Sequence, residues 1–369
     1  MLGERGLSAT GVGAILTVAL VAGAAFSFGT GALVDRLGRR MTLVLAAGAM
    51  AATGMLLALA RDPVELVLAA LLGTLSPGGQ EVGPFAAIEQ AAIAEVSAGT
   101  PTRRFATYNI VGAFAAAIGA LIAAIVPSEA LFWGYGCVGL GLAAIYAVTF
   151  SPAKPPRRQA APASAVLPSR ALHLGIVERL TLLFGLDALA GGFAVQSFIA
   201  YWLHLRFGAD AHALGVLFFG TNVLAALSLL VAARLAEVIG LLKTMVVTHL
   251  PSNVLLLVVP LVPSFPLAAV VLLARAALSQ MDVPTRQAYT MALVPSAERT
   301  RAAGLTAAVR PAAAAVAPLL AGLAVQGAAF GLPFYLAGVL KIVYDLMLFA
   351  TFRQVALPAE AEPSRAEPA

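Results

Sequence analysis

The sequence predicts an all-α integral membrane protein with about eleven transmembrane helices arranged in two pseudo-symmetric bundles. Composition is the first observation: 60% of the 369 residues are hydrophobic, only 11% are charged, and the mean hydropathy is +0.92. Soluble domains carry about 25% charged residues, and a single soluble core could not hide so much apolar surface. The second observation is the recurrence of apolar stretches of bilayer length, and the third is a weak internal repeat.

Apolar stretches long enough to cross a bilayer, about 20 residues each, define the expected helices. They lie near residues 8–32, 41–60, 64–87, 105–126, 131–150, 176–203, 212–233, 244–262, 266–285, 302–326 and 332–351. The first five form an N-terminal bundle (1–150) and the last six a C-terminal bundle (176–352). Residues 151–175, rich in Pro and Ala, predict a flexible cytoplasmic linker. Residues 353–369 have the composition of a disordered cytoplasmic tail.

The basic residues predict the orientation. With alternating spans, sixteen of the 23 Lys and Arg fall in loops on one side, three on the other and four within spans. Cytoplasmic loops are enriched in Lys and Arg, so we expect the C-terminus in the cytoplasm and residue 1 outside, in the cytoplasmic membrane of a bacterium. The net charge of +5 is then a topology signal, and no nucleic-acid partner is needed to explain it. The single Cys137 excludes an intrachain disulfide.

The loop after the first span concentrates charges and glycines. Residues 31–40 read Gly-Ala-Leu-Val-Asp-Arg-Leu-Gly-Arg-Arg. This pattern resembles the loop signature of the major facilitator superfamily, G-x-L-x-D-R-x-G-R-R/K. The matching residues are Gly31, Leu33, Asp35, Arg36, Gly38, Arg39 and Arg40. A generic positive-inside loop explains the arginines but not Asp35 and both glycines.

The resemblance covers the chain to about residue 352. It implies that the loop latches the two bundles on the cytoplasmic side, with Asp35 accepting hydrogen bonds from an Arg or a helix N-terminus. In the family, this loop joins the second and third membrane helices, but here one apolar run precedes it. We therefore expect the first family helix to be absent, through a misplaced start site or a true truncation. The span 105–126 has Gly112 and Gly119 without the Pro of a drug/proton antiporter motif.

Two segments of the second half resemble segments of the first. Residues 233–240 follow the seventh span as the motif follows the first, and Asp35 and Gly38 each lie 202 positions before Glu237 and Gly240. Glu81 similarly precedes Asp282 by 201 positions. Paired repeats are common in transporters. Glu237 and Gly240 are therefore the expected counterpart of the latch.

Charges inside the spans mark candidate sites, because each costs roughly 2.5 kcal/mol or more in hydrocarbon. Asp187 lies near the middle of the sixth span, after which Gly191 and Gly192 suggest a bend. It is a candidate for substrate or proton binding, or for a structural hydrogen bond. Arg275, at similar depth, either contacts an anionic substrate or pairs with an acid such as Asp187. The resemblance implies that the third, sixth and ninth spans line the cavity. The cavity candidates are Asp187, Arg275, Glu81 and Gln196.

Other charged residues suggest gates or structural pairs. Asp282 and Arg286, spaced i, i+4 near a cytoplasmic end, predict a gate or an interbundle latch rather than a substrate contact. Glu89 is a further gate candidate, or a carboxylate solvated at the interface. Lys341 and Asp345 are expected to neutralise each other. Two further expectations are that Arg310 reaches the membrane surface and that His204, His212, His249 and His173 are bystanders, because their spacing binds no metal.

We predict a secondary active transporter that moves a small solute by alternating access, coupled to a proton or another ion, with efflux as one direction. No P-loop, nucleophile arrangement or His/Cys cluster is present in the sequence, so we expect no enzyme activity, metal or cofactor. The expected partners are the solute, a coupling ion and membrane lipid, and the expected state is a monomer. Alternatives are a non-transporting sensor or scaffold on the same fold, and an inactive truncated fragment.

Overall fold

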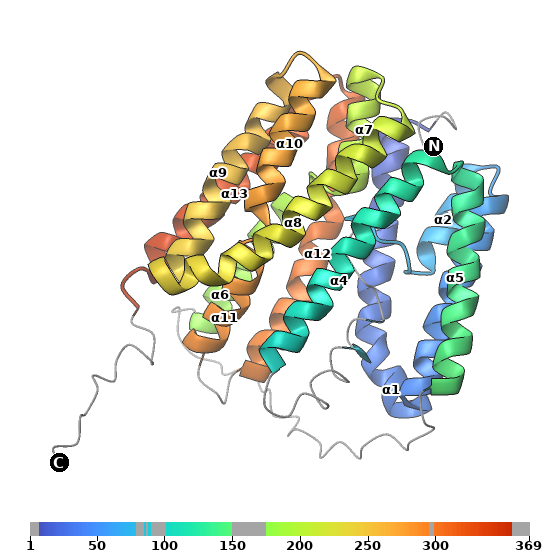
Figure 1. Cartoon of the computed structure of the whole chain (residues 1–369), viewed down its shortest axis with the longest axis horizontal. Helices are drawn as coiled ribbons and strands as arrows, with labels where there is room; N and C mark the ends of the chain where they lie inside the picture. Colours follow the sequence, from blue (N-terminus) through green and yellow to red (C-terminus); the bar gives the residue numbers. More distant parts are fainter. Residues whose placement is uncertain are drawn as a thin grey trace.

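The computed structural model describes residues 7–78, 85, 88–89, 101–149, 175–294 and 299–355, which form two helical bundles (Figure 1). The first bundle, named after the first half of the chain, comprises α1 (Ala9–Leu59), α2 (Pro63–Leu71) and α5 (Ser128–Thr149), together with α4 (Pro101–Ile125), which packs against α8. The second comprises α6 (Ile176–Gly192), α7 (Gln196–Phe207), α8 (Ala211–Ile239), α9 (Leu241–Val258), the 3₁₀ turn η1 (Val259–Leu261), α10 (Phe265–Ser279), α11 (Asp282–Leu293), α12 (Arg299–Gln326) and α13 (Leu332–Phe352).

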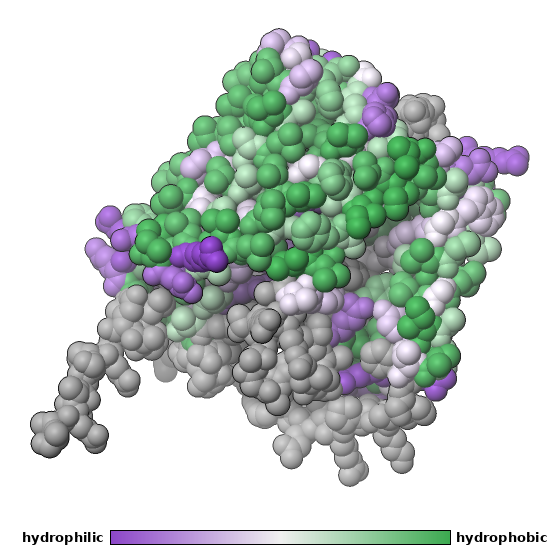
Figure 2. Space-filling view, viewed as in Figure 1, coloured by the Kyte–Doolittle hydropathy of each residue, from purple (hydrophilic) through white to green (hydrophobic). Residues whose placement is uncertain are grey.

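The outer surface of these helices is apolar, as a lipid-facing surface must be. Val148, Val238 and Leu261 are 85%, 80% and 68% exposed. Figure 2 shows hydrophobic residues covering most of the visible flank of the molecule. Ten stretches of helix among the described residues are long and apolar enough to span a membrane. The predicted class, an all-α integral membrane protein, is therefore confirmed.

The predicted third span, 64–87, differs from the structure in its described part. Its helix α2 begins at Pro63 behind an Asp62–Glu65 capping box and ends at Leu71. Gly73 follows with a φ of +70°, which ends the helix. A Cβ at Gly73 would lie 2.7 Å from the carbonyl oxygen of Ala22, so this turn packs directly on α1. Most of residues 79–87 fall outside the described part of the chain.

The first two predicted spans form a hairpin, whose turn is at Gly38 within α1. Gly38 has φ 81° and ψ 160°, a region that only glycine populates readily. Ile15 and Leu57 lie in one buried cluster, so the two halves of α1 run antiparallel. In Figure 1 this turn lies at the lower end of the molecule, opposite the N-terminus.

A second turn repeats this geometry 202 residues later. Gly240, between α8 and α9, has φ 86° and ψ 158°. The hydroxyl of Thr244 donates to the carbonyl oxygen of Gly240 at 2.8 Å, as Thr42 donates to that of Gly38 at 2.9 Å. Both turns lie at the same end of the molecule (Figure 1). The internal repeat seen in the sequence thus has the same backbone form in both bundles.

Two of the predicted spans contain a break. The predicted bend near Gly191 is found between α6 and α7, where Phe193–Val195 leave the helix. The predicted span 266–285 is broken between α10 and α11. Pro284 lacks an N–H for the carbonyl of Gln280, which instead accepts from Val283 at 3.2 Å.

The bundles are in backbone contact at the end of the molecule where the N-terminus lies (Figure 1). α1 packs against α12, and α4 against α8. A Cβ at Gly13 would lie 2.3 Å from the carbonyl oxygen of Pro318, and one at Gly322 would lie 2.3 Å from that of Ala9. Glycines therefore permit this close approach. The backbone N–H of Thr10 also donates to Gln326 at 3.3 Å across this contact.

Candidate functional site

A cavity of about 510 Å³ lies between the bundles and is lined chiefly by the second one. This volume falls within the roughly 300–1,000 Å³ typical of small-molecule sites. Leu20 of α1 and Gly78 contribute from the first bundle. The charged side chains among the described lining residues are Asp187, Arg275, Asp282, Arg286, Arg310 and Lys341. A group of this charge density inside a membrane-spanning fold marks a functional site by default.

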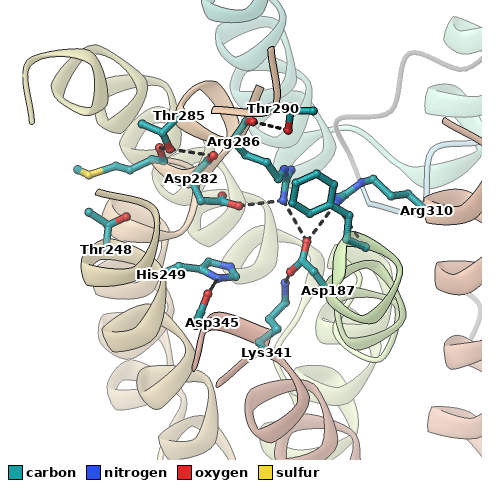
Figure 3. A network of polar contacts seen from close by, with 12 residues as sticks. Asp187, Thr248, His249, Asp282, Thr285, Arg286, Thr290, Arg310, Lys341 and Asp345 are labelled. Atoms are coloured by element: carbon teal, nitrogen blue, oxygen red, sulfur yellow. Dashed lines mark hydrogen bonds and ion pairs between the residues drawn. The ribbon is translucent and has the colours of Figure 1, made fainter. Parts of the chain in front are cut away.

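Asp187 is the centre of the charged cluster (Figure 3). Its Oδ1 accepts from Nζ of Lys341 at 2.6 Å, and its Oδ2 accepts from Nη1 of Arg286 at 3.1 Å and Nη1 of Arg310 at 3.2 Å. The carboxylate is only 4% exposed. Helices α11, α12 and α13 thus each send one cation to a single acid on α6. Because burying an isolated ion is costly, this convergence stabilises all four charges together.

Arg286 links Asp187 to a second acid. Its Nη1 donates to Oδ2 of Asp282 at 2.9 Å, so the predicted i, i+4 pair is present. Its guanidinium also lies 5.6 Å from the ring centroid of Phe184, a cation–π contact. The pair was expected near a cytoplasmic gate, away from the substrate. Both side chains line the cavity, at the start of α11, a helix that packs against α9 and α8.

Arg275 lines the same cavity but joins none of these ion pairs. Its Nε is buried without a hydrogen-bond partner. Among the described residues, no carboxylate lies within 4.0 Å of its guanidinium, so the expected pairing with Asp187 is not formed. Arg275 therefore presents to the cavity a guanidinium that has no direct ion-pair partner among the described residues.

Three expectations about single charges are wrong. Lys341 binds Asp187 and not its i, i+4 neighbour Asp345. Asp345 binds Nδ1 of His249 at 2.8 Å and Nδ2 of Asn253 at 2.8 Å. His249 is thus a buried residue of the cavity wall and no bystander. Arg310, expected at the membrane surface, turns inward to Asp187 because that carboxylate offers a charged partner across the bundle.

The remaining cavity and gate candidates separate in the structure. Gln196 begins α7 and lines the cavity. Glu81 lies outside the described residues. Glu89 accepts from the hydroxyls of Tyr108 at 2.7 Å and Tyr146 at 2.8 Å. Glu89 is half-buried and contacts α4 and α5 through these two hydroxyls, so it is more than a carboxylate held by water alone, the alternative considered from the sequence.

The expected latch lies at the turn of the α1 hairpin. Asp35 and Arg36 are exposed just before Gly38, and Arg39 and Arg40 are partly exposed just after it. The counterpart acid Glu237 is exposed in the last turn of α8, three residues before Gly240. The backbone of Gly31 is helical, like its neighbours in α1. Both segments thus occupy the same position relative to their turns.

Comparisons with known proteins agree with this architecture. The family model of the Major Facilitator Superfamily matches residues 1–205 and 180–369. An uncharacterized membrane protein of Saccharomyces cerevisiae is 24% identical over 361 residues, covering 86% of this chain and 81% of the yeast protein.

Solved transporters share the fold at low sequence identity. The nucleoside transporter NupG, in a point-variant form, aligns with a TM-score of 0.76 at 13% identity over 95% of this chain and 93% of its own. A D-xylose-proton symporter aligns with a TM-score of 0.73 at 16% identity, over 95% and 90% of the two chains. The inward-open xylose transporter XylE from E. coli aligns with a TM-score of 0.71 at 13% identity, over 95% and 88%. With the family model covering the whole chain, this multi-pass membrane protein belongs to the major facilitator superfamily.

Proposed function

We propose that the protein is a secondary active transporter that moves a small solute across a bacterial cytoplasmic membrane by alternating access. The observation that carries the proposal is a charged cavity between two bundles whose backbones touch at one end. A permanent structural interface has no need of six charged side chains around a cavity of metabolite size. The fold of a membrane transporter supports the same conclusion.

The expected orientation of the chain indicates at which side of the membrane the cavity is closed. With residue 1 outside and the Gly38 and Gly240 turns in the cytoplasm, the glycine contacts of α1 with α12 close the outer side. The Gly31–Arg40 latch and its Glu237 counterpart then act at the cytoplasmic side in the alternate state. Asp282 and Arg286 change partners as the bundles rock, which makes them the inner part of the gate.

The break between α6 and α7 supplies a second contact between the bundles. The backbone N–H and the hydroxyl of Ser197 donate to the carbonyl oxygen of Pro77 at 3.0 and 2.9 Å. This contact lies next to Gly78 and Gln196, two residues of the cavity wall. Solute binding in the cavity is therefore coupled to the movement of the first bundle through Pro77.

Coupling to a proton or another ion has two candidate sites. Asp187 can exchange its three cationic partners for a solute or an ion. The buried pair of His249 and Asp345 adds an imidazole, the side chain whose charge changes nearest to neutral pH. The structural neighbours, a nucleoside transporter and a D-xylose-proton symporter, support a small solute and a coupling proton.

Flux through purified protein in proteoliposomes tests the proposal. Wild-type protein should catalyse solute uptake that responds to an imposed pH gradient or ion gradient, and Asp187→Asn should abolish the response. Arg206→Gln, an exposed cation at the end of α7, is the matched control and should transport normally. Binding of a solute without any flux would refute transport and favour a sensor on the same fold.

A further inference from the structure

We propose that the solute is a small organic anion, a carboxylate or a phosphate monoester, held by Arg275 beside the Asp187 cluster. This inference rests on the proposed transport function, and it names the class of solute. It is carried by the charge balance of the cavity, by the unpaired guanidinium and by the neutral polar groups around them.

The described side chains of the cavity wall carry an excess of positive charge. The described side chains that line it include four cations, Arg275, Arg286, Arg310 and Lys341, against two carboxylates, Asp187 and Asp282. The net charge of these described side chains is therefore +2, with His249 counted as neutral. Asp345 does not line the cavity, and its oxygens are occupied by His249 and Asn253. Uncompensated charge inside a membrane protein is costly, so occupation by an anion relieves an existing cost.

Arg275 is the group with the most to gain from an anion. A guanidinium carries five N–H donors in a planar fork that matches carboxylate and phosphate oxygens. The Nε of Arg275 is buried with no acceptor. The other three cations share Asp187, so Arg275 is the described cation of the wall that has no carboxylate within 4.0 Å.

Asp187 behaves as an internal anion in this arrangement. Its Oδ1 accepts from Lys341, while its Oδ2 is shared by Arg310 and by Arg286, which also binds Asp282, so three cations depend on two carboxylates. An incoming carboxylate or phosphate can take over some of these hydrogen bonds. Asp187 is then a competitor of the solute, released as the solute binds.

The neutral part of the wall indicates an anion that also carries hydroxyl or amide groups. Gln196, Thr221, Ser279 and Gln280 line the cavity. A cavity of about 510 Å³ is larger than an inorganic oxyanion requires. A neutral solute of the same size would satisfy these amides and hydroxyls but would leave the net charge of +2 and Arg275 uncompensated.

The test uses full-length protein in nanodiscs and solutes built on one scaffold. Neutral glucose is compared with glucuronate and glucose 6-phosphate, and inorganic phosphate is the minimal probe, all at matched ionic strength. The apparent Kd is obtained from the rise of Tm with solute concentration. The variants are Arg275→Gln, the charge-conserving Arg275→Lys, Lys341→Gln as a second cation removal, and Arg206→Gln as the exposed control.

We expect at least one anion to raise the Tm of wild-type protein and of Arg206→Gln, and glucose to raise neither. Arg275→Gln should weaken anion binding by about 10- to 100-fold, the effect of one charged hydrogen-bonding partner, and Arg275→Lys should restore part of it. Lys341→Gln should also weaken anion binding, and it provides the test if Arg275→Gln does not fold. Comparing the Kd of glucuronate with that of glucose 6-phosphate shows whether the site prefers a carboxylate or a phosphate.

Three results would overturn the inference: glucose binding as tightly as the anions, an anion effect unchanged in Arg275→Gln, or no anion-specific effect in wild-type protein. Flux of the same solutes in proteoliposomes distinguishes a wrong solute class from a wrong transport function. Anion binding without flux would refute transport and support the anion site. Flux of glucose without anion binding would support transport and refute the anion site.

Discussion

Replacing Gly13 with Ala should prevent the two bundles from closing at the end where the N-terminus lies. The new Cβ would lie 2.3 Å from the carbonyl oxygen of Pro318 and 3.2 Å from Cα of Leu319. Ordinary contacts of a Cβ begin at 3.4 Å, so the helices must separate by about 1 Å at a rigid backbone atom. Overpacking of this kind costs about 1–3 kcal/mol.

This cost applies only to the conformation in which α1 and α12 touch. The population of that conformation should therefore fall by about 5- to 150-fold relative to the open one. Gly29→Ala, on the same half of α1, is the matched control, because a Cβ there would meet no atom within 4 Å. The gain in helix propensity from Gly to Ala is the same in both variants, so it cancels in the comparison.

Cross-linking across the contact measures the closed population. Thr10→Cys and Gln326→Cys place two thiols at the Thr10–Gln326 hydrogen bond, in a Cys137→Ser background that removes the exposed native thiol. A short bismaleimide should link the pair rapidly in otherwise unchanged protein and in Gly29→Ala, and much more slowly in Gly13→Ala. Equal rates in the two alanine variants would refute the reasoning that backbone contact at Gly13 closes this end.

Three further predictions concern the turn and the charged cluster. Gly38→Ala should lower the free energy of unfolding by about 1–3 kcal/mol, because a φ of 81° with a ψ of 160° suits only glycine; thermal unfolding no different from Gly29→Ala would contradict this. Asp187→Asn should lower the free energy of unfolding by about 3–5 kcal/mol, because Lys341 and Arg310 lose their carboxylate partner and Arg286 keeps only Asp282. The same variant should bind glucose 6-phosphate more tightly, and weaker binding would show that Asp187 does not compete with the solute. His249→Gln should lower the free energy of unfolding by about 1–3 kcal/mol, since Asp345 loses a buried donor. It should also weaken the response of flux to an imposed pH gradient, and an unchanged response in proteoliposomes would exclude His249 from coupling.

Local features of the sequence predicted the turns of the fold well. Gly38 and Gly240 stand out in the sequence because each follows an apolar run at the same offset, and both adopt the same backbone conformation in the structure. Apolar runs likewise located ten spans, since hydropathy is a property of each segment by itself. The break after α6 was signalled by Gly191 and Gly192.

Partners across the bundle were predicted less well. Lys341 and Asp345 share one helix face at i, i+4, so the sequence favoured a pair between them. In the structure α6 brings Asp187 to Lys341, and α9 brings His249 to Asp345. The charges of Arg310 and Lys341 marked both residues as unusual within a span. Their common target could not be read from spacing along one helix.

The sequence by itself determined the membrane class, most of the helix positions, the turn glycines and the family of this protein. These follow from hydrophobicity, backbone conformation and a local motif, all of which act within one segment of chain. Only the tertiary structure decided that Arg286, Arg310 and Lys341 meet at Asp187 while Arg275 stays unpaired. The physical reason is that a buried charge takes the counter-ion that helix packing brings within hydrogen-bond distance, and that neighbour comes from a distant part of the chain.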